Sequence, residues 1–288
     1  MPLDSDRLLK PMKKLGKLTR TLRRDAPPET VHELRTTARR IEATVYALHL
    51  DEQEPGKALL GDMEVVRKLA GKVRDCDVLI QYTASLHPGE EEQDCLVRLL
   101  ETLGAERHGH AKQLHRGMRD QGRALRKELK AARKDIAGLL SGDEGNGNAA
   151  QTAAATALEL AGQLSAPQRL NAATLHPYRL TVKQLQNTLR LAAGASHAGL
   201  LEELGQVKDA IGEWHDWEAL VTIATEVIEH DHCQLLTTLQ QTEQRKRKQA
   251  LAAATRLRAN TLRKPARGQR ASRGTSRPVL TAIAMLTG

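Results

Sequence analysis

The sequence predicts an all-α protein made of two linked four-helix bundles. Helix-forming residues, chiefly Ala, Leu, Glu, Gln, Lys and Arg, dominate the 288 residues. No segment shows the clear alternation of apolar and polar residues that indicates a strand. Segments rich in Pro, Gly and Asn interrupt the helical pattern, and two motifs occur once in each half of the chain. These interruptions and repeats together predict duplicated helical bundles.

The boundaries of the helices follow from the interruptions. Breaks that contain Pro or Gly are found at residues 25–28, 53–56, 87–89, 165–167 and 194–197. The strongest break, 141–148, is rich in Gly and Asn, as flexible linkers are. We therefore expect a first half, a linker, a second half and a flexible basic tail, at residues 1–140, 141–150, 151–264 and 265–288. Four helices fit between the breaks of each half.

Two motifs recur in the same order, which indicates internal duplication. Val31–Ile41 aligns with Leu175–Leu185, and Gly71–Leu79 aligns with Gly212–Leu220. In the first motif, three basic residues of one half lie opposite three of the other: His32, Arg35 and Arg39 opposite His176, Arg179 and Lys183.

Both copies of the first motif place cations along one face of a helix. The spacing i, i+3, i+7 keeps the three basic residues on one side, while apolar residues such as Leu34 and Ile41 occupy the other. In the second half, Arg190 extends the row. Acidic residues four positions away are scarce, so the cations are not neutralised within the helix. This arrangement predicts an anion-binding face.

Two further rows of cations have the same helical spacing, and they are weaker indications because they are not duplicated. The first helix carries Lys13, Lys17, Arg20 and Arg24. Later in the first half, a second row comprises Arg116, Arg119, Arg123, Arg126, Lys130 and Arg133. Like charges crowded in this way repel one another, and a bound polyanion would offset that repulsion.

The charge and the composition restrict the class of ligand. The net charge is +9, yet the chain has no Phe, three Tyr and two Trp. Domains that recognise single-stranded nucleic acids stack bases on aromatic side chains, so this composition argues against them. It favours a polyanion that is bound through its charge. The three cysteines form no CxxC pair, and no signal peptide or membrane span is found. We therefore expect a soluble cytoplasmic protein without disulfides.

The second motif supplies acidic residues with an orienting role. We expect Asp75, Asp77 and Asp216 to hold Arg or His side chains of neighbouring helices in place. A metal site would require a converging set of donors, and the sequence shows none. No metal and no cofactor are therefore predicted.

The motifs resemble those of the CHAD family, the conserved histidine α-helical domain. The resemblance spans about Asp4 to Lys264 and is carried by His-x-x-Arg and Gly-x-x-Arg/His-Asp in both halves. It implies two pseudo-symmetric four-helix bundles around a basic central cavity that binds inorganic polyphosphate. By position, it implies phosphate contacts for His32, Arg35, Arg39, Arg40, His176, Arg179 and Lys183.

The halves are unequal in charge. Gln184 occupies the position of Arg40, and the segment Gln151–Leu164 is nearly uncharged, whereas Arg7–Arg24 is strongly basic. We therefore expect the first half to bind the more strongly. The ExExK motif of the triphosphatase module that some relatives carry is absent from this sequence, so a stand-alone domain is expected.

The predicted function is non-catalytic binding of inorganic polyphosphate. Phosphate or sulfate ions can mimic this ligand, and the binding would allow the protein to associate with polyphosphate granules. Binding should tighten as the pH falls through roughly 6.5, because a phosphate chain favours the charged form of histidine. Non-sequence-specific nucleic-acid binding is the first alternative. An enzyme that acts on phosphate compounds is the second, since Glu29-x-x-His32 matches half of a di-iron ligand set, without a second copy at His176.

Overall fold

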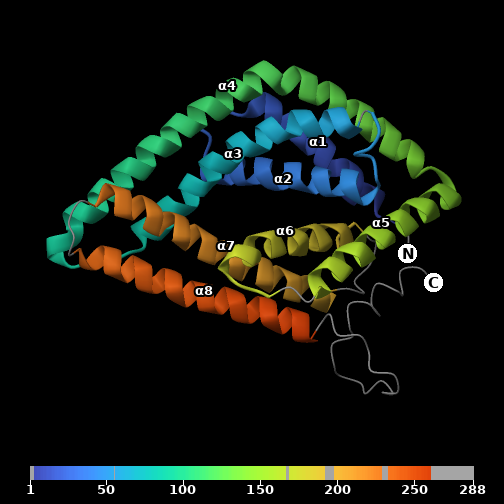
Figure 1. Ribbon diagram of the computed structural model, residues 1–288. Helices are drawn as coiled ribbons and strands as arrows, with labels where there is room; N and C mark the ends of the chain where they lie inside the picture. Colours follow the sequence, from blue (N-terminus) through green and yellow to red (C-terminus); the bar gives the residue numbers. More distant parts are fainter. Residues whose placement is uncertain (1–2, 55, 167–168, 192–197, 229–232, 261–288) are drawn as a thin grey trace.

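A computed structural model describes residues 3–54, 56–166, 169–191, 198–228 and 233–260. Within these ranges the chain forms eight α-helices and one short 3₁₀ helix and contains no strand, so the predicted all-α class is confirmed (Figure 1). The first four helices are α1 (Ser5–Thr21), α2 (Pro28–Ala47), α3 (Gly56–Ala84) and α4 (Gln93–Leu139), with the 3₁₀ helix Glu90–Glu92 before α4. The second four are α5 (Gly142–Ser165), α6 (Ala172–Leu189), α7 (Ala198–Val227) and α8 (Gln234–Asn260).

Local sequence signals start several of these helices. The Asp4 carboxylate accepts hydrogen bonds from the backbone N–H groups of Asp6 and Arg7 at 3.0 and 3.2 Å, which caps α1. Pro28 occupies the first turn of α2, where its missing N–H costs nothing. At the start of α6, Asn171 and Thr174 form a reciprocal capping box.

Each half has its own apolar core. Side chains of α1 to α4 form the first core, and α4 arches over α1, α2 and α3 (Figure 1). The second core lies among α5, α6, α7 and α8. The two copies of the first motif therefore occupy the second helix of each half, and the two copies of the second motif occupy the third.

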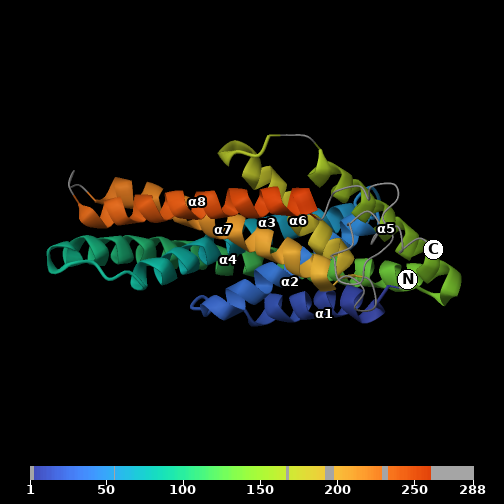
Figure 2. The same ribbon diagram turned by 90° about the horizontal axis from the view of Figure 1, so that it is seen from below.

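A third core joins the halves at one end of the molecule. Here the end of α3 and the start of α4 lie beside the end of α7 and the start of α8 (Figures 1 and 2). The rings of Tyr82 on α3 and Trp217 on α7 stack with their centroids 5.0 Å apart. Leu79, Leu103 and Leu220 are buried around them. This contact between α3 and α7 fixes one half against the other.

The predicted linker 141–150 is helical, which corrects our expectation. Gly142, the first residue of α5, has a φ of +77°, which glycine adopts readily. Residues after Gly142 continue directly into α5, where Asn146 receives a 2.8 Å hydrogen bond from the backbone of Leu3. Ala149 and Ala153 pack in the first core, whereas Ala157 packs in the second. Tertiary contacts thus override the weak helix propensity of the Gly/Asn-rich run.

The predicted tail, residues 265–288, lies outside the described residues. In the described part, none of the helices has the length and apolarity needed to cross a membrane. Cys76, Cys95 and Cys233 are all free thiols.

Candidate anion-binding site

The two motif helices α2 and α6 lie against each other across the two halves (Figure 1). Leu34 and Ile41 of α2 are fully buried in the first core, and Leu175 and Val182 of α6 are fully buried in the second. Because each helix turns its apolar face into its own half, the cationic faces are left on the sides where the halves meet.

Cations from both halves come close together at the centre of this contact. Lys183 of α6 lies near Arg39 and Arg35 of α2 and near Arg179 of α6. Burial lowers the pKa of Lys183 to about 6, and the repulsion from these arginines and from Lys208 acts in the same direction. The free protein therefore disfavours the charged form of the Lys183 amine.

The carboxylates of the protein do not balance these cations. In the described part of the chain, no carboxylate lies within ion-pair distance of Arg39 or Lys183. The buried Nε atoms of Arg35 and Arg39 have no hydrogen-bond partner there either. Burial and then repulsion from Arg35 lower the pKa of Arg39, although Glu42 opposes this. Unpaired buried cations are costly unless an anion offsets them.

The aspartates of the second motif lie beside basic side chains of neighbouring helices. Asp75 is 3.6 Å from the guanidinium of Arg35, which connects α3 to α2. Asp77 is buried and accepts a 2.7 Å hydrogen bond from Nε of Arg107 on α4. Burial raises the pKa of Asp216, while nearby Arg179 counteracts that rise. These contacts restrict the orientation of long cationic side chains.

The motif glycines have different surroundings. A Cβ atom at Gly212 would lie only 2.6 Å from Nη2 of Arg179, so the glycine lets this guanidinium cross close to α7. There, Nε of Arg179 donates to the carbonyl oxygen of Lys208 at 3.2 Å. At Gly71, the equivalent position of the first half, no atom would lie within 4 Å of an added Cβ.

Arg67 and Lys208 belong to this region, and our sequence reasoning missed both. Arg67 forms a 2.8 Å ion pair with Glu42, and Lys208 forms a 3.0 Å ion pair with Asp209. Each lies four residues before a motif glycine. Their equivalent positions in the two repeats are the signal that could have identified them.

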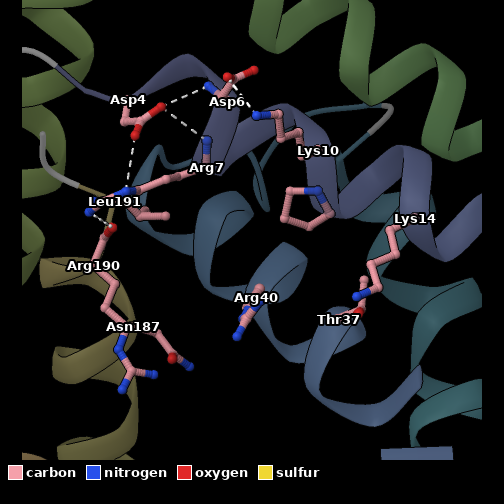
Figure 3. A pocket seen from close by; sticks show the side chains of 11 residues that line it. Asp4, Asp6, Arg7, Lys10, Lys14, Thr37, Arg40, Asn187, Arg190 and Leu191 are labelled. Carbon is pink, nitrogen blue, oxygen red and sulfur yellow. Dashed lines mark hydrogen bonds and ion pairs between the residues drawn. The ribbon is translucent and has the colours of Figure 1, made fainter. Parts of the chain in front are cut away.

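One end of the α2–α6 contact opens into a cavity of about 670 Å³ (Figure 3). Figure 3 shows Arg40 of α2 and Arg190, which directly follows α6, on different sides of this cavity. Three basic residues of α1 also line it, and our sequence analysis did not single them out: Arg7, Lys10 and Lys14. Asp4 and Asp6 lie at its edge and form ion pairs with Arg7 and Lys10 at 3.0 and 2.7 Å.

The two motif histidines lie toward the other end of α2 and α6. His32 lines a cavity of about 830 Å³ together with Arg74 and Arg107. The rings of His176 and His215 lie 5.3 Å apart. Burial lowers the pKa of both motif histidines, and repulsion from Arg74 at His32 and from His215 at His176 lowers it further.

The weaker rows divide between two environments. Six cations of these rows line a groove between α1 and α4: Lys13, Lys17, Arg20, Arg126, Lys130 and Arg133. The other predicted residues of these rows are exposed and line none of the three cavities: Arg24, Arg116, Arg119 and Arg123. The structure thus brings together the α2 and α6 rows, and parts of the α1 and α4 rows.

Comparisons with known proteins agree with this architecture. No curated protein matches the chain. The CHAD domain from the plant Ricinus communis is 17% identical, with a TM-score of 0.63 over 90% of this chain and 93% of that one. PptA from Streptomyces chartreusis is 14% identical, with a TM-score of 0.65 over 89% of this chain and 99% of that one. At these identities the likeness shows the fold alone. The CHAD domain family model matches residues 8–225, most of the sequence, and the chain therefore belongs to the CHAD domain family.

Proposed function

We propose that this chain binds inorganic polyphosphate, without hydrolysing it, through the cationic faces of α2 and α6. The observation that carries the proposal is the meeting of two cationic faces from different halves. Arg35 and Arg179 have aspartates nearby, whereas within the described residues no carboxylate lies at ion-pair distance from Arg39 or Lys183. A phosphate chain would supply the missing negative charge, and arginine forks suit phosphate oxygens.

The order of the cations along α2 suits a linear polyanion. His32, Arg35, Arg39 and Arg40 follow one another over about two turns, or roughly 12 Å at 1.5 Å per residue. They lead from the cavity beside His32 to the cavity of Figure 3. A chain with one negative charge or more on each phosphate could contact successive cations along this row.

The two halves contribute unequally to the cavity of Figure 3. Helix α1 provides Arg7, Lys10 and Lys14, whereas no residue of α5 lines this cavity. Since α1 and α5 are the first helices of their halves, the difference follows their unequal content of basic residues. The inequality supports stronger binding by the first half.

A competition experiment tests this function against nucleic-acid binding. Labelled polyphosphate bound to the full chain should be displaced by unlabelled polyphosphate, and far less by duplex DNA at equal phosphate concentration. The expected reason is that a duplex is too wide to reach the partly buried Arg39 and Lys183, whereas a single phosphate chain can. Equal displacement by duplex DNA would contradict the polyphosphate proposal. Steady release of phosphate in the presence of Mg²⁺ or Mn²⁺ would contradict the absence of hydrolysis.

The glycine of the second motif provides a more local test. Changing Gly212→Ala should weaken polyphosphate binding by about three- to tenfold, because the added Cβ displaces the Arg179 guanidinium. The Gly71→Ala variant is the matched control: its Cβ meets open space, so affinity should be unchanged. The control should also gain up to ~1 kcal/mol of stability from its better helix propensity. Isothermal titration calorimetry measures the affinity for polyphosphate, and thermal denaturation measures the stability. Equal affinities of the two variants would show that Arg179 is not displaced or does not bind polyphosphate.

A further inference from the structure

A groove outside the α2–α6 contact carries a second concentration of positive charge. It lies between α1 and α4, has a volume of about 420 Å³, and has an apolar floor that includes Met12 and Leu129. Three cations from each helix line its walls: Lys13, Lys17 and Arg20 from α1, and Arg126, Lys130 and Arg133 from α4. No acidic residue lines it.

Antiparallel packing of α1 and α4 explains why two separate rows meet here. Nη1 of Arg126 is 3.5 Å from Oγ1 of Thr19, and further along Nδ1 of His115 is 3.3 Å from the carbonyl oxygen of Leu22. Residue numbers thus fall along α4 as they rise along α1, so Lys13 and Lys17 lie opposite the later cations of the α4 row.

Several other cations of the same two helices form ion pairs, and in the described part of the chain the groove cations do not. Lys10 pairs with Asp6 at 2.7 Å, Arg119 lies 3.6 Å from Asp120, and Lys127 lies 3.9 Å from Glu128. By contrast, within the described residues none of the six groove cations forms an ion pair. Some cations elsewhere on α1 and α4 are therefore neutralised and others, such as Arg116 and Arg123, are not, whereas none of the six that converge on the groove is ion-paired within the described residues.

The groove is close to the cavity of Figure 3, because both use α1. Lys10 and Lys14 line that cavity, and Lys13 and Lys17 line the groove. At about 100° per residue, these pairs lie on neighbouring faces of one helix. A flexible chain can therefore pass from one set of cations to the other by crossing α1.

We propose that the α1–α4 groove is a second binding site for the phosphate chain, which holds the part of a long polyphosphate that extends beyond the central site. This inference rests on the proposed function. A phosphate chain fits better than a nucleic-acid duplex because the cations line both walls of a groove of about 420 Å³, which can hold part of a single chain and is too small to admit a duplex. No aromatic residue lines the groove either, so it offers no surface on which bases could stack.

The test uses the full chain and two phosphate ligands of different length. The groove variant replaces three exposed lysines of the groove by glutamine: Lys13, Lys17 and Lys130. The control variant removes the same charge from α8 by replacing three exposed residues by glutamine: Arg245, Lys248 and Arg256. We expect the groove variant to bind polyphosphate of about 100 units at least tenfold more weakly than the control does. Its salt dependence should also be shallower, since fewer counterions are released. The tightest binding of tripolyphosphate, at the central site, should change less than about twofold in both variants.

The outcomes separate the two proposals. Equal affinities of the groove and control variants for long polyphosphate would overturn the second site, while binding by the wild type would leave the central site standing. Weaker binding of tripolyphosphate and of long polyphosphate by the same factor would also overturn it, because the groove residues would then act on the central site. Absence of any polyphosphate binding by the wild type would overturn both. Loss of duplex DNA binding alone in the groove variant would assign the groove to nucleic acid instead.

Discussion

Replacing Arg39 and Arg179 together by methionine is expected to weaken polyphosphate binding by a hundredfold or more. The two guanidiniums come from different halves and lie near each other at the centre of the α2–α6 contact. A hydrogen bond that involves a charged group contributes about 1.5–3 kcal/mol, so the loss of two corresponds to a factor of about 150 or more. Removing either arginine alone should have a smaller effect, since its partner from the other half still binds.

The double variant should fold, because methionine relieves the repulsion between the two guanidiniums, and Asp216, which loses Arg179, still lies near His215 and Arg35. Calorimetric titration against polyphosphate at constant salt measures the affinity, and circular dichroism verifies the helical content. The control is Arg245→Met with Lys248→Met, which removes the same charge from the exposed face of α8. If both double variants lose affinity equally, binding depends on net charge and not on the α2–α6 site.

Replacing Lys183 by methionine is expected to stabilise the free protein and to weaken its binding of polyphosphate. In the folded chain the pKa of Lys183 is about 6, against an ordinary value of 10.5, because the amine is buried among arginines. Unfolding therefore takes up a proton between about pH 6 and pH 10.5. The free energy of unfolding consequently falls as the pH falls through this window. The full cost of holding a protonated Lys183 in the folded chain is reached below about pH 6. Methionine keeps the apolar stem and removes this penalty.

The melting temperature of Lys183→Met should exceed that of the wild type by several degrees at pH 6.5 and by much less at pH 9.5. A gain of 1 kcal/mol corresponds to about 2–4 °C in a chain of roughly this size. A melting temperature below that of the wild type at pH 6.5 would show that Lys183 is charged and partnered in the folded protein. A change of equal size at both pH values would attribute the gain to packing instead.

The same lysine should make binding depend on protons. A phosphate chain raises the pKa of Lys183, so the wild type should take up close to one proton on binding at pH 8, and the methionine variant should take up fewer. Titrations in two buffers of different ionisation enthalpy count these protons. The pKa values of His32 and His176 are lowered in the free protein, so these histidines take up protons on binding only at lower pH. The methionine variant should retain this histidine-dependent proton uptake.

The α-helical class and the placement of the motifs could be predicted because they depend on local patterns. Leu34 and Ile41 recur on the face of α2 opposite its cations, and the structure buries both completely. The linker prediction was wrong because it relied on a local preference that tertiary contacts override. Its Gly/Asn-rich composition is a weak local preference, and the contacts of Asn146 with Leu3 and of Ala149 with the first core outweigh it.

The site could be predicted only in part. Helical periodicity and duplication together identified the α2 and α6 rows. Arg7, Lys10 and Lys14 have the same i, i+3, i+7 spacing without a duplicate in the second half, and they reach the cavity of Figure 3 only because α1 packs beside α2. The rows on α1 and α4 were visible in the sequence, but four of their members lie apart from the groove. Spacing along one helix says which residues share a face, and it cannot say what that face meets.

The sequence by itself determined that the chain is helical, that its excess positive charge lies in rows opposite apolar faces, and that two of these rows are duplicated. These features follow from periodicity, which is a property of neighbouring residues. Only the tertiary structure decided that the rows of α2 and α6 meet with Lys183 buried among arginines, and that α1 and α4 close a second cationic groove. Such meetings depend on how helices far apart in the sequence pack their apolar faces, because burial of those faces sets where each cationic face points.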